Sequence, residues 1–134
     1  MEKSLVLIKP DGIKRALIGE VIDRIERRGL KIDGLRMLTM NREMAEQHYG
    51  EHRGKSFYGD LLEYITSGPL VAIAVSGYKA IQVIRTMVGA TDPVEAAPGT
   101  IRGDFALLKG ENIIHASDSQ SSAERELALF FRSV

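Results

Sequence analysis

Leu70-Val71-Ala72-Ile73-Ala74-Val75 is an uninterrupted apolar run, and the fold depends on it more than on any other stretch. It lies between the turn-forming residues Ser67-Gly68-Pro69 and Ser76-Gly77. An apolar run of this length with turn residues on both sides is typical of a buried β-strand. We therefore predict that residues 70–75 form a central strand of a sheet.

Three other stretches are predicted strands. Residues 4–9 are largely apolar and end at Pro10-Asp11-Gly12, a pattern typical of a strand that runs into a turn. Residues 31–40 alternate loosely between apolar and polar side chains. Residues 112–115 form a final short strand that leads into a polar turn, Ser117-Asp118-Ser119.

Apolar residues at helical spacing predict two longer helices, near residues 18–25 and 80–88. A glycine follows each of them, Gly29 and Gly89, as a C-cap.

Two short helices are predicted at residues 41–49 and 58–66, the first with Asn41 as its N-cap. Residues 91–103, which are rich in Pro and Gly, are predicted to be a loop. The last helix is predicted to begin at Ser121-Ser122-Ala123-Glu124, a capping box.

The main elements follow the order strand, helix, strand, strand, helix, strand. This order predicts an α+β fold of the ferredoxin-like (βαββαβ) type, with a four-stranded antiparallel sheet and helices on one face. The length of 134 residues fits a single domain, residues 1–134. This fold alone implies no function, because enzymes, RNA binders and regulators share it.

Composition excludes several classes of function. The chain has 18 basic and 18 acidic residues, so it lacks the basic excess of a general nucleic-acid or membrane-surface binder. It has no cysteine, which excludes disulfides, thiolate metal ligands and a cysteine nucleophile. The apolar run near the start, residues 5–8, is too short for a membrane span or a secretory signal. We expect a cytoplasmic protein without a membrane partner.

Two local patterns have weak functional interpretations. Residues 50–56, Gly-Glu-His-Arg-Gly-Lys-Ser, resemble a Walker A loop but have three residues between the glycines where the motif needs four. His48 and His52 have the spacing of a zinc-binding pair, but the sequence shows neither the H-E-x-x-H pattern nor a third ligand.

His115 is the strongest candidate for a nucleophile. It ends an apolar strand and precedes a polar turn and a helix N-terminus, where backbone N–H groups can bind phosphate. Imidazole is a competent nucleophile near neutral pH if a partner holds one ring nitrogen. Glu126 on the following helix can be that partner, and Ser117 can orient the pair. A structural role for a lone histidine of this kind is the competing interpretation.

Three cations could surround a polyphosphate. Lys9 ends the first strand, Arg85 lies on a helix and Arg102 lies in the segment rich in Pro and Gly. If they converge on one cleft, they suit phosphoryl transfer, which depends mainly on positioning and charge stabilisation. Each alone could be an ordinary surface charge.

Five stretches in order resemble the nucleoside diphosphate kinase family, and the resemblance covers nearly the whole chain. They are Lys9-Pro10-Asp11-Gly12, His48-Tyr49, Ser67-Gly68-Pro69, Pro98-Gly99-Thr100-Ile101-Arg102-Gly103-Asp104, and Asn112-Ile113-Ile114-His115-Ala116-Ser117-Asp118-Ser119. The last resembles the active-site segment of the family, although Ala116 stands where many members have glycine.

The resemblance implies a ping-pong phosphotransferase reaction. A nucleoside triphosphate, mainly ATP, gives its γ-phosphoryl to Nδ1 of His115, and a nucleoside diphosphate then takes it. Glu126 holds the other ring nitrogen, and Ser117 contacts Glu126. Lys9 and Tyr49 complete the implied catalytic set.

The resemblance also implies how the nucleotide binds. Mg²⁺ is the expected cofactor, held mainly by the nucleotide phosphates without a protein metal site. Phe57 is expected to stack on the base, which predicts broad base specificity because every base has a π-face. The full set of expected nucleotide-binding residues is Lys9, Phe57, Arg85, Thr91, Arg102 and Asn112.

Assembly and alternative functions complete the predictions. The resemblance also implies a homo-oligomer, since family members form hexamers or tetramers, and the compact segment at residues 91–103 resembles that of hexameric members, which favours a hexamer. One alternative is a non-catalytic regulator that binds nucleotide, but the complete set of site residues argues against it. Another is an RRM-type RNA-binding module, which the zero net charge and the 6% aromatic content disfavour, so we expect no specific nucleic-acid partner.

Overall fold

The computed structural model describes residues 1–131. Its strands are β1 (Glu2–Ile8), β2 (Lys31–Leu38), β3 (Leu70–Gly77) and β4 (Ile114–Ala116). Its α-helices are α1 (Pro10–Lys14), α2 (Ile18–Arg27), α3 (Arg42–His48), α4 (Tyr58–Ile65), α5 (Ala80–Val88), α6 (Ile101–Phe105) and α7 (Gln120–Phe130). Two 3₁₀ turns are η1 (Gly50–His52) and η2 (Pro93–Glu95). None of the helices in this part of the chain has the length and apolar character that a membrane crossing requires.

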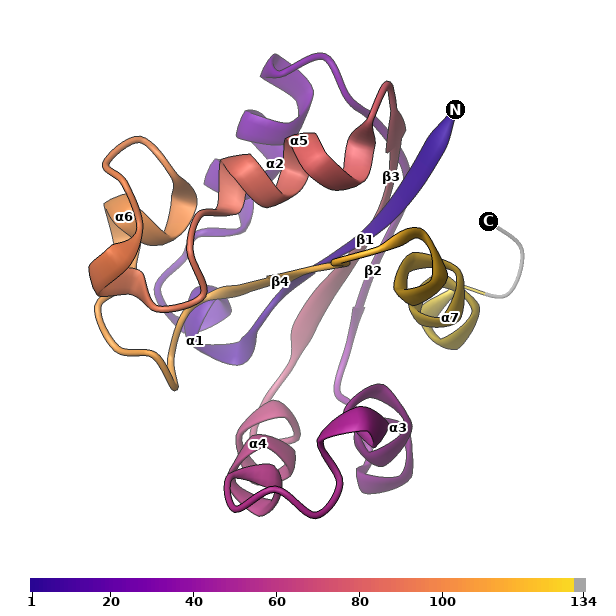
Figure 1. Cartoon of the computed structure of the whole chain (residues 1–134), viewed down its shortest axis with the longest axis vertical. Coiled ribbons are helices and arrows are strands. Elements are labelled where there is room, and N and C mark those ends of the chain that lie inside the picture. Colours follow the sequence, from indigo (N-terminus) through magenta and orange to yellow (C-terminus); the bar gives the residue numbers. More distant parts are fainter. Residues whose placement is uncertain (132–134) are drawn as a thin grey trace.

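The four strands form one antiparallel sheet in the order β2-β3-β1-β4 (Figure 1). The two strands at the centre, β3 and β1, pair along their whole length, for example Leu5 opposite Ala74. Every residue of β3 is buried, which confirms the prediction of a central strand at residues 70–75. The element order and the antiparallel pairing confirm the ferredoxin-like α+β fold.

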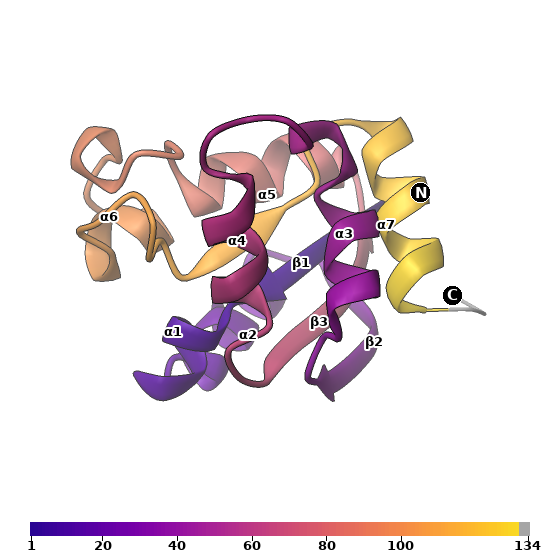
Figure 2. The same cartoon turned by 90° about the horizontal axis from the view of Figure 1, so that it is seen from below.

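Helices cover both faces of the sheet, so the prediction that they lie on one face was wrong (Figures 1 and 2). Successive side chains of a strand point to opposite faces. Val6 and Ile8 of β1 therefore pack with α2 and α5, whereas Leu5 and Leu7 pack with α3, α4 and α7. Burial of each such side chain stabilises the fold by about 1.5–3 kcal/mol. Strands that are apolar at every position need cover on both sides.

Two helix starts differ from the prediction. Pro10-Asp11-Gly12 opens the short helix α1, because proline is well suited to the first position of a helix. The last helix begins earlier than predicted: the N-cap is Ser119, whose hydroxyl accepts from the N–H of Ser122 at 3.1 Å.

The short strand β4 begins two residues later than the strand predicted at residues 112–115.

The segment at residues 91–103 is more ordered than the predicted loop. It contains η2, and its end forms the start of α6, where the Thr100 hydroxyl accepts from the N–H of Gly103. A side chain at Gly103 would lie 2.0 Å from the carbonyl oxygen of Ala97, so only glycine fits.

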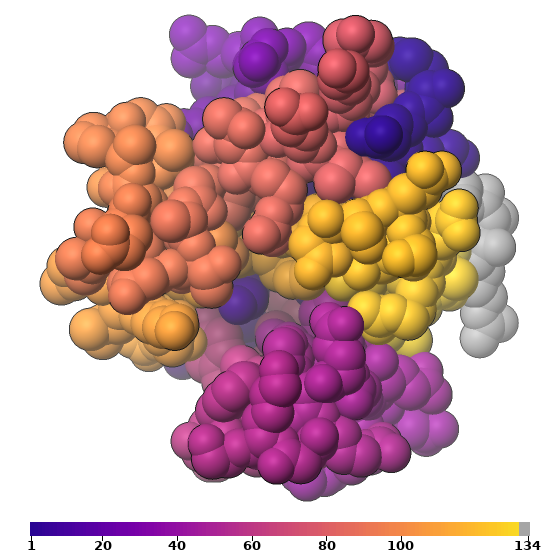
Figure 3. Space-filling view, in the orientation of Figure 1, coloured from indigo at the N-terminus to yellow at the C-terminus, as the bar shows by residue number. Residues whose placement is uncertain are grey.

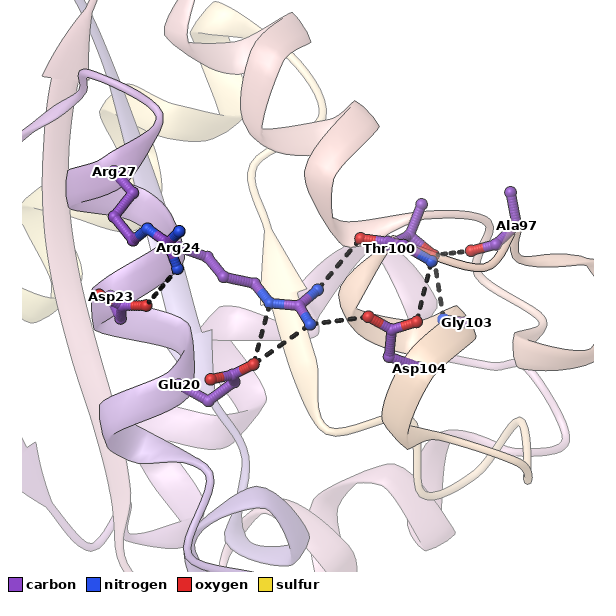
Figure 4. Close-up of polar contacts among 9 residues, drawn as sticks. Glu20, Asp23, Arg24, Arg27, Ala97, Thr100, Gly103 and Asp104 are labelled. Atoms are coloured by element: carbon purple, nitrogen blue, oxygen red, sulfur yellow. Dashed lines mark hydrogen bonds and ion pairs between the residues drawn. The ribbon is translucent and has the colours of Figure 1, made fainter.

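Arg24 connects α2 to this segment (Figure 4). Its guanidinium lies 2.7 Å from the carboxylate of Asp104 and 3.2 Å from that of Glu20, and it donates to the carbonyl of Gly99 at 3.1 Å. Asp104 in turn accepts from the N–H of Gly99 at 2.8 Å. The network holds α6, the helix that carries Arg102, against α2.

Candidate active site

His115 lies in the middle of β4, opposite Leu7 of β1, and its side chain is partly exposed. Its neighbours Ile114 and Ala116 are buried, so the strand presents the imidazole on the face that α3 and α7 cover. The space-filling view shows a hollow between α7 (yellow), the α6 segment (orange) and the α3–α4 region (magenta), with the start of the chain (indigo) at its floor (Figure 3). The elements that carry the candidate residues border this hollow.

A hydrogen-bonded chain fixes the tautomer of His115. Nε2 of His115 lies 2.9 Å from Oε2 of Glu126, and the hydroxyl of Ser117 donates to Oε1 of Glu126 at 2.7 Å. A carboxylate can only accept, so Nε2 carries the proton and Nδ1 keeps its lone pair. Burial raises the pKa of Glu126, but the hydrogen bonds from His115 and Ser117 outweigh it and hold that pKa below its ordinary value. The arrangement leaves Nδ1 as a nucleophile.

Three cations lie close to one another beside the His115–Glu126–Ser117 hydrogen bonds. Lys9 follows β1, and its Nζ donates to Oδ1 of Asn112 at 2.9 Å. Burial and the charge of Arg102 lower the pKa of Lys9 to about 8. Burial and the charge of Arg85 lower the pKa of Arg102 to about 10. An anion among these three side chains would relieve their repulsion, so the electrostatics favour a polyphosphate ligand.

Arg102 also has a structural role. Its buried guanidinium donates to the backbone carbonyls of Gly89 at 3.0 Å and Ile114 at 2.7 Å. Arg85 donates to the carbonyl of Ala116 at 3.2 Å. The two arginines thereby join α5 and α6 to β4, the strand that carries His115.

The other predicted site residues are Asn112, Thr91, Tyr49 and Phe57, and not all of them belong to the hydrogen-bonded group. The side chain of Asn112 donates to the carbonyl of Thr91 at 3.2 Å, so both join the Lys9 group. Tyr49 is buried, and burial together with the charge of Glu126 raises its pKa to about 12. Phe57 stands outside the hydrogen-bonded group at the start of α4, with 44% of its surface exposed, and its ring lies 5.5 Å from that of His52.

Asp11 and Ile113 are residues whose importance sequence reasoning missed. Ile113 has a φ of 72°, a conformation that is an outlier for a β-branched residue. Its N–H donates to Oδ2 of Asp11 at 3.0 Å, and the hydroxyl of Tyr64 donates to the other oxygen. A side chain at Gly12 would lie 2.8 Å from Ile8 and 3.2 Å from the carbonyl of Ile113. Asp11 and Gly12 together hold the strained turn at Ile113, and this turn fixes the positions of Asn112 and His115.

We expect Asp11→Ala to lower the free energy of unfolding by about 1–3 kcal/mol, because the Ile113 N–H loses its acceptor. Urea denaturation measures this change. Asp60→Ala, an exposed aspartate on α4, is the matched control and should change stability little. Equal stability of the two variants would show that Asp11 does not hold the turn.

His48 lies beside a residue that its sequence position did not indicate. It ends α3, is buried, and its ring lies 4.9 Å from that of His115 in an edge-on arrangement. Burial, with the nearby charges of His115 and Arg125, lowers its pKa to about 2, so it stays neutral. The zinc-binding pair considered for His48 and His52 is not what the fold assembles, because His48 groups with His115 and Glu126.

Comparisons with known proteins agree with this geometry. The sequence model of the family described as nucleoside diphosphate kinase matches residues 2–134. A nucleoside diphosphate kinase of Archaeoglobus fulgidus is 63% identical over 131 residues, covering 98% of this chain and 87% of that protein. One from Parafrankia is 58% identical over 130 residues, covering 97% and 95%.

Solved structures give the same result. A family protein of Babesia bovis superposes with a TM-score of 0.95 at 45% identity, covering 98% of this chain and 88% of that one. A halophilic nucleoside diphosphate kinase of Halobacterium salinarum, solved in complex with CDP, also has a TM-score of 0.95 at 45% identity, covering 97% and 87%.

Proposed function

The chain belongs to the nucleoside diphosphate kinase family, and we propose that His115 carries the phosphoryl group in its reaction. The enzyme is a phosphotransferase that moves the γ-phosphoryl of a nucleoside triphosphate to a nucleoside diphosphate. The observation that supports His115 is its 2.9 Å contact from Nε2 to Glu126, which leaves Nδ1 free. Residues 1–134 are proposed to act as one catalytic domain.

The proposed first half-reaction follows from these contacts. Nδ1 of His115 forms a bond to the γ-phosphorus as the bond from that phosphorus to the β-phosphate oxygen breaks, and the diphosphate leaves. The imidazole gains positive charge in this step, and the carboxylate of Glu126 stabilises it. The second half-reaction reverses these steps with another diphosphate. Lys9 and Arg102, with Arg85, would neutralise the phosphate charge.

Other side chains are proposed to position the nucleotide. Asn112 holds the Lys9 ammonium and would contact the sugar or the leaving oxygen. Thr91, which accepts from Asn112 through its carbonyl, would contribute to the phosphate end of the site. Tyr49 contacts the ring of His48, which in turn packs against the ring of His115.

Mg²⁺ is proposed as the cofactor, bound mainly by the nucleotide phosphates. Mg²⁺ prefers oxygen ligands and keeps several waters. Lys9, Arg85 and Arg102 contribute positive charge, and the nearby carboxylate of Glu126 is already held by His115 and Ser117. Because this carboxylate is already engaged, the phosphates of the nucleotide would supply most of the oxygen ligands of the ion. When bound, the ion would neutralise part of the phosphate charge.

Incubation of the protein with γ-labelled ATP and Mg²⁺ tests this proposal. A phosphohistidine keeps its label in alkali, loses it in acid and passes it to added GDP. Absence of label from a protein that still binds nucleotide would instead indicate a regulator.

We expect Phe57→Ala to weaken binding of all nucleoside diphosphates to a similar extent, by about 1–3 kcal/mol, because stacking uses the π-face that every base has. Calorimetry with ADP, GDP and CDP measures the change. Tyr78→Ala is the matched control, because Tyr78 is an exposed aromatic residue in the turn between β3 and α5. A loss confined to one base would contradict the stacking role.

We expect kcat/KM to fall as the pH rises above about 8, where Lys9 in the free enzyme loses its proton and its attraction for phosphate. Its pKa in the folded state lies below the ordinary value of 10.5, so the unfolded chain binds more protons between these two values. The free energy of unfolding should therefore rise with pH across that window. Lys9→Arg should remove the alkaline decline in kcat/KM; a decline unchanged in that variant would rule out Lys9 as its cause.

A homo-oligomer, with a hexamer favoured over a tetramer, is also proposed. β2 is an edge strand of the sheet and exposes Leu35 and Met37, which are 52% and 58% accessible. Exposed apolar edge strands are ready sites for pairing with another chain. Light scattering distinguishes the two assemblies by mass. The cytoplasmic location expected from the sequence stays a prediction.

A further inference from the structure

His48 has no hydrogen-bond partner for either ring nitrogen among residues 1–131, although only 2% of its surface is exposed. Buried polar atoms in native proteins nearly always have a partner, so an orphaned imidazole needs an explanation. Its ring packs against those of His115, Tyr49 and Phe130. The phosphoryl-transfer mechanism proposed above gives it no role.

The orphaned nitrogens lie next to two other metal-ligating groups. One ligand atom each from His48, His115 and Glu126 lies within 4.8 Å of the others. Tetrahedral Zn²⁺ binds nitrogen and oxygen at about 2.0–2.2 Å, which places neighbouring ligand atoms roughly 3.3 Å apart. Nε2 of His115 and Oε2 of Glu126, 2.9 Å apart, already approach that spacing. Binding of the ion would draw the His48 nitrogen closer to these two atoms, from within the 4.8 Å that now separates the three groups at most.

We propose that His48, His115 and Glu126 form a binding site for a transition-metal cation of the Zn²⁺ type, and that an ion bound there blocks phosphoryl transfer. Two imidazoles and one carboxylate are a ligand set that Zn²⁺ uses, with further positions open to water. The chain offers no cysteine that would compete for the ion.

The block follows from the chemistry of imidazole and rests on the proposed role of His115. An ion that takes the lone pair of Nε2 displaces the proton which Nε2 now donates to Glu126. Neutral imidazole keeps one proton, which then resides on Nδ1. Nδ1 loses the lone pair that would attack the γ-phosphorus. The ion therefore inactivates the nucleophile without occupying the nucleotide site.

The surroundings make the site selective. Mg²⁺ prefers an octahedral shell of oxygen atoms and would gain little from two imidazoles. Nearby positive charges, such as Arg125 at 3.8 Å from Oε2 of Glu126, oppose any cation. Only an ion with a strong preference for imidazole, such as Zn²⁺ or Cu²⁺, would overcome that repulsion.

Metal binding is tested first on the full chain without nucleotide, with Co²⁺ as a spectroscopic probe and Zn²⁺ in calorimetry. We expect one ion per chain and the intense visible absorption of tetrahedral Co²⁺. His48→Phe, which keeps the ring packing, should weaken binding by at least 100-fold, since loss even of an outer-shell partner costs about 10- to 100-fold. His52→Gln is the matched control and should bind as the unaltered chain does.

The block is then tested by labelling with γ-labelled ATP and excess Mg²⁺, with and without Zn²⁺. Zn²⁺ should slow labelling of the unaltered chain and of His52→Gln but not of His48→Phe, each compared with its own rate without Zn²⁺. If His48→Phe does not fold, as judged by circular dichroism, His48→Gln replaces it.

Three results would overturn the proposal: Zn²⁺ affinity that His48→Phe leaves unchanged, a Co²⁺ spectrum without tetrahedral character, or undiminished labelling of a chain with Zn²⁺ bound. Labelling without Zn²⁺ separately tests the role of His115, so failure of the metal site is distinguishable from failure of the phosphohistidine mechanism.

Discussion

Replacing His115 with asparagine is expected to abolish phosphoryl transfer while nucleotide binding persists. The variant lacks the nitrogen that would form the bond to phosphorus, and loss of the nucleophile in covalent catalysis costs on the order of a millionfold in kcat. Ser117 still donates to Oε1 of Glu126 at 2.7 Å, so the buried carboxylate keeps a hydrogen-bond partner in the variant. The measurement is labelling by γ-labelled ATP together with transfer to GDP.

Binding distinguishes this result from misfolding. Lys9 and Arg102, the cations proposed to bind phosphate, make their contacts to Asn112 and to backbone carbonyls, none of which involves the imidazole. Calorimetric titration with ADP should therefore give an affinity close to that of the unaltered chain. Retained turnover in the variant would refute the assignment of His115 as the phosphoryl carrier.

Glu126→Gln is expected to produce the second-largest loss. Ser117 donates to Oε1, so the amide oxygen of the new glutamine should stay there and its NH₂ group should face His115. An NH₂ group can only donate, which requires a lone pair on Nε2 and moves the imidazole proton to Nδ1. A comparable carboxylate-to-amide change in a serine protease lowers kcat by about 10⁴-fold.

This effect is identified by comparing kcat/KM with the affinity for ADP. We expect kcat/KM to fall by about 10²- to 10⁴-fold with little change in ADP affinity, because the tautomer of His115 is altered and the phosphate-binding cations are not. Glu124→Gln, an exposed glutamate on the same helix, is the matched control and should be fully active. Normal activity of Glu126→Gln would show that the hydrogen bond does not set the tautomer.

The elements of the fold were largely predictable from short-range patterns. The apolar run at residues 70–75 identified β3, and helical spacing identified α2 and α5. These signals work because strand and helix periodicities repeat within a few residues. The boundary error at the last helix fell where two local signals compete: Ser119 and Ser121 are both good N-caps, and the hydroxyl of Ser119 reaches the helix.

The candidate site was predictable mainly through the family resemblance. The predicted position of His115 at the end of an apolar strand made it a candidate nucleophile, although the structure places it in the middle of β4, and the motif stretches supplied its expected partners. No local pattern indicated the role of Asp11, because its partner Ile113 lies 102 residues further along the chain. The pairing of His48 with His115 was hidden for the same reason.

The amino-acid sequence alone determined the order of strands and helices, the α+β class and the membership of the family. These properties can be read from the periodicity of apolar residues and from short motifs, both of which involve residues close together along the chain. Only the tertiary structure decided that helices cover both faces of the sheet and that Glu126 holds Nε2 of His115. It also brought the mutually repelling cations Lys9 and Arg102 together. Such contacts depend on how the sheet and its helices pack, and packing joins residues that no periodicity along the chain relates.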